Sequence, residues 1–187
     1  MRRSIAIAAL VLLSAVAAHA QLASVYVTYS PTHLSNVPSG TAPNGQTQYT
    51  SFWASDIGGG VTVNFLPLPL ITLGWDLRGS TRSGTNGMDT VLGGIRLGIH
   101  PHVIRAKPYI QASTGYLGTR TFNQSSPPGP SPYTNHYFAY EILGGIDYPL
   151  THFIDVRMIE IGGGKVISTG PNTPGLFTLN SGLVVHF

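Results

Sequence analysis

Apolar and polar residues alternate along most of this chain with a period of two, the spacing at which side chains reach the two faces of a β-strand. In Ile71–Gly79, for example, Trp75 and Leu77 share one face while Asp76 and Arg78 share the other. Eight segments of this kind are expected to form strands: Ala23–Ser30, Ile57–Phe65, Ile71–Gly79, Met88–Ile99, Pro108–Tyr116, His136–Asp147, Phe153–Ile161 and Leu176–Phe187.

The connections between these segments alternate in length. Leu66–Leu70 and Tyr148–His152 are short and contain proline, whereas the connections on the other side are long and polar. This rhythm predicts an antiparallel, up-and-down arrangement with short turns at one end and long loops at the other. The predicted long loops are Pro31–Gln48, Ser80–Gly87, Gly118–Thr134 and Lys165–Pro174.

Composition decides which face of the sheet meets solvent. Only 9% of the residues are charged, against about 25% in a typical soluble domain, and there is no cysteine. A soluble β-sandwich or lipocalin-like barrel would need charges on its outward polar face. The apolar face is therefore expected to contact lipid and the polar face to be enclosed. The predicted fold is all-β, an eight-stranded antiparallel up-and-down transmembrane β-barrel.

The N-terminus has the layout of a secretory signal peptide. Arg2 and Arg3 precede the apolar run Ile5–Ala18, which is too short to span a membrane comfortably, and Ala18-His19-Ala20 supplies small residues for cleavage. We expect residues 1–20 to be removed after Ala20 and residues 21–187 to form the barrel domain in a bacterial outer membrane. Cleavage would reduce Lys plus Arg from 10 to 8 against 7 acidic residues. The resulting charge of +1 does not predict nucleic-acid binding.

Most charged side chains of the strands fall on the polar face. The interior of an eight-stranded barrel is just wide enough for side chains to fill, and charges buried there must pair. A structural ion-pair network is therefore expected, rather than an ion path or paired catalytic carboxylates. Glu160 lies one step out of register with Arg157, and a β-bulge near Met158 and Ile159 would turn it inward. The predicted network comprises Asp76, Arg78, Arg96, Glu141, Asp147, Asp155, Arg157 and Glu160.

Other patterns give little support for catalysis or metal binding. His100 and His102 lack a third nearby ligand, and the glycine clusters precede neither a helical pattern nor a Lys-Ser/Thr pair. The element His33-Leu34-Ser35-Asn36 resembles the His-x-Ser-Asn element of outer-membrane lipid A deacylases. No glutamate follows within reach to orient a Ser-His pair. We expect no enzymatic activity, no cofactor and no metal site.

The last strand carries a further signal. The chain ends on Phe187, with Val185 and Leu183 at alternate positions before it, and this looks like the C-terminal signal read by the barrel assembly machinery. Together with the strands GGGVTVNF, LGWDLRG and IDVRMIE, it makes Gln21–Phe187 resemble the outer-membrane protein β-barrel domain family, the small OmpA/OmpX-like class.

The resemblance implies a structural or surface-interaction role through the extracellular loops. The implied partners are outer-membrane lipid, the barrel assembly machinery and an extracellular partner of unknown identity. A lipid-modifying enzyme of the deacylase kind and a narrow pore stay open as alternatives.

Overall fold

The computed structural model describes residues 23–41, 44–68, 70–81, 87–101, 103–121, 133–167 and 173–187. The predicted signal peptide and His102 lie outside these ranges, as does part of each predicted long loop. Within them, no helix is long and apolar enough to span a membrane. The described residues form eight strands: β1 (Ala23–Thr41), β2 (Thr47–Pro67), β3 (Ile71–Thr81), β4 (Gly87–Ile99), β5 (Lys107–Thr121), β6 (Tyr133–Pro149), β7 (Ile154–Ile167) and β8 (Gly175–His186).

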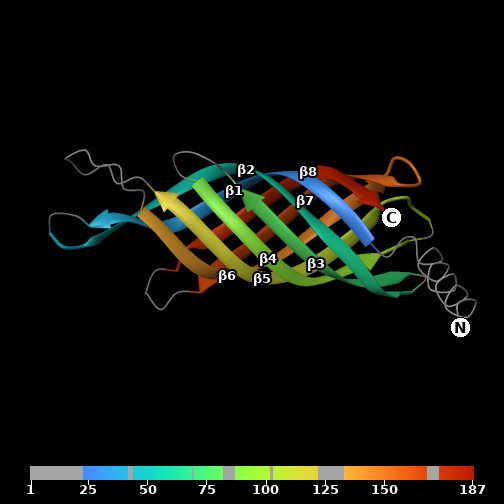
Figure 1. The fold of residues 1–187 in the computed structure, drawn as a ribbon, viewed down its shortest axis with the longest axis horizontal. Coiled ribbons are helices and arrows are strands. Elements are labelled where there is room, and N and C mark those ends of the chain that lie inside the picture. Colours follow the sequence, from blue (N-terminus) through green and yellow to red (C-terminus); the bar gives the residue numbers. More distant parts are fainter. Residues whose placement is uncertain are drawn as a thin grey trace, which may run out of the picture.

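The strands close into a barrel in chain order, each antiparallel to the next, as the alternating pattern predicted (Figure 1). The seam lies between β8 and β1, where Val25 is paired with Val185 and the Phe187 amide donates to the Ala23 carbonyl at 2.9 Å. The start of β1 therefore lies beside the end of the chain. We call this end of the barrel, which also holds the short connections, the turn end, and the opposite one the loop end.

The first predicted loop is the main error of the sequence interpretation. Pro31–Gln48 is rich in Pro, Gly, Ser and Asn, yet most of it is strand, and the β1–β2 ladder continues to the pair Thr41–Thr47. Threonine and tyrosine pair well across strands, and Pro31 is tolerated because its missing N–H falls where the pairing of β1 with β8 is interrupted. Gly45, in the connection between the two strands, has a φ of +79°, a conformation that glycine adopts without strain.

The wall has an apolar outside and a largely polar inside. Large apolar side chains on the outward rows are exposed, among them Val27 at 60%, Ile57 at 69% and Leu77 at 58%. The inward rows bury threonine, serine and charged side chains, including Asp76 at 2% exposed and Arg157 at 0%. Soluble proteins distribute these groups the other way round. This distribution is the one that the few charges and the alternation predicted.

β7 contains the bulge that the position of Glu160 required. Its ladder to β6 passes from Ile146–Ile159 to Asp147–Arg157, so that Met158 has no partner there, and the register with β8 shifts at the same point. Met158 and Ile159 both face outward, while Arg157 and Glu160 are both buried. The extra residue brings two charged side chains of one strand to the same side of the wall.

Candidate functional site: the closed lumen

Two tyrosines from strands on opposite sides of the barrel occupy the middle of the lumen. Tyr26 in β1 is paired with Gly60 in β2, and Tyr109 in β5 is paired with Gly145 in β6. A Cβ atom on either glycine would lie 2.4 or 2.5 Å from the hydroxyl oxygen of the paired tyrosine. The two glycines therefore leave the space in which each ring lies against the neighbouring strand.

The tyrosine hydroxyls hold two carboxylates in place. Tyr26 Oη donates to Asp76 at 2.9 Å, and Tyr109 Oη donates to Glu160 at 2.5 Å. The amide of Gln111, which is 1% exposed, also donates to Asp76 at 2.6 Å. Buried carboxylates need several donors of this kind to remain stable away from water.

Three arginines and three carboxylates form one continuous chain of ion pairs through the lumen. Their charges cancel, and most of the groups are almost completely buried. Removing one partner of such a network leaves an uncompensated charge in the interior, which is strongly destabilising. In order of contact the six residues are Arg96, Asp147, Arg157, Glu160, Arg78 and Asp76, with N–O distances of 2.5, 3.1, 3.3, 2.9 and 3.1 Å.

The same arginines stack on the tyrosine rings. The guanidinium carbon of Arg157 lies 4.3 Å from the ring centre of Tyr26 and 5.1 Å from that of Tyr109. Arg96 lies 3.6 Å from the Tyr109 ring centre, and Arg78 lies 5.9 Å from that of Tyr26. Cations and aromatic faces therefore alternate across the barrel and fill its cross-section. We call these five residues, with Asp76, Asp147 and Glu160, the central plug.

A smaller polar cluster lies at the turn end. Asp155 Oδ2 accepts from Lys107 Nζ and interacts with His186 Nε2, both at 2.8 Å. These groups line a pocket of about 140 Å³ together with His100. Burial lowers the pKa of His100, and the positive charges of Lys107 and Arg96 lower it further. The neutral imidazole is therefore the favoured form in the folded barrel.

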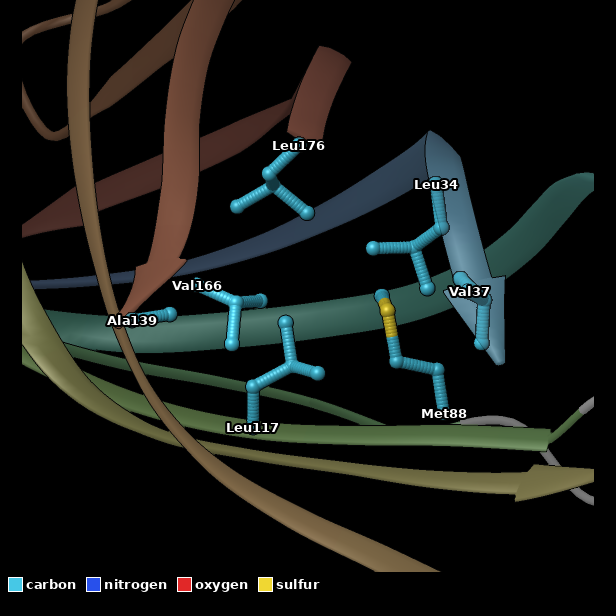
Figure 2. Packing of buried hydrophobic residues seen from close by; sticks show 7 residues of the cluster. All are labelled: Leu34, Val37, Met88, Leu117, Ala139, Val166 and Leu176. Atoms are coloured by element: carbon cyan, nitrogen blue, oxygen red, sulfur yellow. The ribbon is translucent and has the colours of Figure 1, made fainter. Parts of the chain in front are cut away.

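The loop end of the lumen is closed by apolar side chains, which the sequence interpretation did not foresee. Seven buried residues from six strands point toward one another inside the wall (Figure 2), and Phe52 and Tyr137 pack against them. Between them and the central plug, the Glu141 carboxylate accepts a hydrogen bond from Thr178 Oγ1. We call the seven the apolar cluster: Leu34, Val37, Met88, Leu117, Ala139, Val166 and Leu176.

The structure brings together six of the eight charged residues predicted to form a lumen network. Asp155 joins the separate cluster at the turn end, and Glu141 lies toward the loop end with Thr178. Sequence reasoning missed both tyrosines. The available signal was their position in the alternating pattern. Tyr26 shares the polar row of its strand with Ser24 and Thr28, and Tyr109 shares that of its strand with Gln111 and Ser113.

The remaining sequence candidates lie on the wall. His33 is on the outward row of β1, with its ring centre 5.0 Å from that of Trp53, and Ser35 Oγ donates to the Gly175 carbonyl at 3.5 Å. On the last strand, Leu183 and Phe187 face outward and Val185 is half-buried. The role of this row in assembly stays a prediction.

Comparisons with known proteins identify the fold. No protein-family model matches the sequence, and no curated protein is similar to it. The N-terminal β-barrel domain of OprF from Pseudomonas aeruginosa superimposes with a TM-score of 0.51 at 15% identity, covering 88% of this chain and 97% of that domain. Neisserial surface protein A has a TM-score of 0.48 at 14% identity, covering 87% of this chain and 97% of its own. The chain thus has the fold of small eight-stranded outer-membrane barrels, as its strand pattern and terminal phenylalanine predicted.

Proposed function

We propose that this chain is a non-enzymatic surface protein of a bacterial outer membrane, whose closed barrel anchors extracellular segments that contact a partner. The observation that carries the proposal is the reversed polarity of the wall. Val27, Ile57 and Leu77 are exposed on the outside, while Arg157 and Glu160 are completely buried inside. This arrangement is stable in lipid, because the outer row then meets hydrocarbon and the inner charges meet one another.

The filled lumen favours an anchor over a narrow pore. An ion entering from the loop end would meet the apolar cluster, which offers no polar group to replace its water shell. Beyond it, Arg157 lies between the two stacked tyrosines inside the barrel. The three arginines of the central plug balance its three carboxylates, so that the plug has no net charge to attract a permeating ion. Two layers of different chemistry would have to move before ions could pass.

The positions of His33 and Ser35 favour a non-enzymatic role over lipid A deacylation. His33 stacks on Trp53, and the Ser35 hydroxyl is directed to a backbone carbonyl of β8. A serine nucleophile needs a base in hydrogen-bond reach, which is in turn oriented by a third group. The contacts of both side chains, with Trp53 and with the Gly175 carbonyl, are those of residues in the barrel wall and do not pair serine with histidine.

Three measurements test the proposal. The full chain, refolded in lipid vesicles, is expected to migrate faster in cold detergent gels than after boiling, and to give no steady single-channel conductance in planar bilayers. Steady conductance would contradict the closed anchor and show that the protein is a pore. Cells with and without the gene are expected to have the same lipid A acylation pattern, and loss of an acyl chain that depends on His33 would establish the enzyme instead.

A further inference from the structure

A small polar cavity lies inside the barrel between the apolar cluster and the central plug. Its volume is about 40 Å³, and its lining includes Met88 and Leu176 of the apolar cluster and Tyr26 and Arg78 of the central plug. Figure 2 shows Met88 and Leu176 pointing into the lumen from different strands. Roughly 10–15 Å³ of such volume holds one water molecule, so that a small ion and one or two water molecules fit. We call this space the lumen cavity.

Glu141 brings a negative charge to the lumen cavity that no ion pair balances. The residue lines the cavity and is only 2% exposed. Its carboxylate accepts one hydrogen bond, from Thr178 Oγ1, and among the described residues it makes no ion pair. The arginines and carboxylates of the central plug already cancel one another. An isolated carboxylate in the interior is costly, so that this charge requires compensation.

The one arginine that lines the lumen cavity is engaged elsewhere. Arg78 Nε donates to Asp76 at 3.1 Å, and its Nη1 and Nη2 donate to the two oxygens of Glu160 at 2.9 and 3.2 Å. Nη2 also donates to the side-chain carbonyl of Gln111 at 3.2 Å. Every nitrogen of the guanidinium therefore has an acceptor other than Glu141. A separate cation would balance Glu141 without taking Arg78 from the central plug.

The rest of the lining offers neutral oxygen atoms. Thr28 Oγ1 and Ser30 Oγ lie 3.0 Å apart and both residues line the cavity. Asn180, which is 7% exposed, lines it as well. Its Nδ2 donates to Glu160 at 2.5 Å, whereas its Oδ1 has no hydrogen-bond partner in the described part of the chain. A buried carbonyl oxygen without a partner is uncommon in proteins. Carboxylate, carbonyl and hydroxyl oxygens are the ligands that hard cations prefer.

We propose that the lumen cavity binds a small monovalent cation such as sodium, with Glu141 as its charged ligand and Asn180 Oδ1 as a neutral one. A single carboxylate balances a single positive charge, whereas sites for divalent ions usually draw on several carboxylates. A proton would also neutralise Glu141, but it would leave the neutral oxygens of the lining without a common partner.

The position of the lumen cavity makes the bound ion a structural one. The apolar cluster lies on one side of it and the central plug on the other. The ion is therefore enclosed when the strands close, and it stabilises the folded barrel without passing through it. Binding of this kind is measured as stability, because the unfolded chain has no such site.

The test measures how the stability of the full chain in vesicles of zwitterionic lipid depends on the cation. Urea titrations are carried out at constant ionic strength while sodium chloride is replaced stepwise by choline chloride, whose cation is too large for the lumen cavity. Above the dissociation constant for sodium, each tenfold increase in its concentration is expected to raise the ratio of folded to unfolded protein about tenfold.

Two variants connect this dependence to the site. Glu141→Gln keeps the length of the side chain and an oxygen for Thr178 but removes the charge, and it is expected to abolish the dependence on sodium. Asp155→Asn, which removes a carboxylate from the cluster at the turn end, is the matched control and should retain the dependence in full. If Glu141→Gln does not fold, the wild-type barrel still decides. The carbon NMR shift of the Glu141 carboxyl group is expected to be that of an ionised group in sodium and to change in choline.

Two results would overturn the inference. Equal unfolding midpoints in sodium and choline would show that no ion is bound, and a neutral Glu141 carboxyl group in both salts would then assign a proton to the cavity. Equal sodium dependence in the wild type and Glu141→Gln would place the ion elsewhere. Cold-gel mobility and bilayer conductance of the same samples test the anchor separately, so that a folded, closed barrel without a response to sodium refutes the ion site alone.

Discussion

Tyr26 illustrates how much single residues decide in a lumen this narrow. Its ring has room only because Gly60 stands beside it, and the ring in turn supports Asp76 and Arg157. Gly60→Ala is expected to lower the free energy of unfolding by about 1–3 kcal/mol, since the new Cβ would lie 2.4 Å from the Leu77 carbonyl oxygen and from the tyrosine hydroxyl.

The matched control for this substitution is Gly93→Ala on the outward row. A Cβ there meets only Leu77 Cδ1, at 3.9 Å, within 4 Å. Urea titrations of both variants in lipid vesicles measure the difference. Equal midpoints would contradict the tight packing of Tyr26 over the adjacent strand.

His100 gives the turn end a dependence on pH. Its pKa is lowered in the fold by burial, Lys107 and Arg96, so that the unfolded chain binds the proton more readily. The neutral form therefore contributes stability that is complete above the ordinary value of 6.5 and is lost as pH falls through the lowered folded pKa. His100→Gln is expected to reduce the loss of stability between about pH 7 and pH 5. Unfolding midpoints at several pH values check this, and an unchanged pH slope would contradict it.

At this scale the sequence predicted which charged residues turn inward, but not the groups that they meet. Alternation places Asp76, Arg78 and Arg157 on the polar row. It also places Tyr26 on that row, but it does not show which carboxylate the hydroxyl meets or which guanidinium the ring stacks on. The space left by Gly60 on another strand becomes visible only once the register is known.

At the scale of the strand, the bulge in β7 makes a prediction about chain length. Without Met158, Arg157 and Glu160 would be two residues apart and would face inward by ordinary alternation, with the pairs to β6 preserved. Deletion of Met158 is therefore expected to leave a barrel with normal cold-gel mobility.

Deletion of Ile161 from the same strand is expected to prevent folding. A one-residue change there turns Lys165 inward and Val166 outward, which places a charge in the apolar cluster. Gel mobility after refolding of the two deletions compares them directly. If the variant that lacks Ile161 folds, then burial of Val166 in the apolar cluster does not determine the register of β7.

At the scale of the whole molecule, the outer wall distinguishes a lipid-embedded barrel from a soluble one. Leu77 is 58% exposed, so that Leu77→Lys would cost little in water. In hydrocarbon the same change is expected to cost about 2–4 kcal/mol. Thr47→Lys, on the hairpin beyond the wall, is expected to cost almost nothing. Unfolding in vesicles measures both, and a neutral Leu77→Lys would mean that this row does not contact lipid.

The sequence by itself determined the number of strands, their order and, within the eight predicted segments, the face on which the side chains lie. Alternation is a local property, because successive side chains of a strand must point to opposite sides. The extension of the first hairpin, the apolar cluster and the pairing of Arg157 with Asp147 were decided only by the tertiary structure. These contacts depend on the tilt and stagger of closed strands, which bring together residues that no local pattern relates.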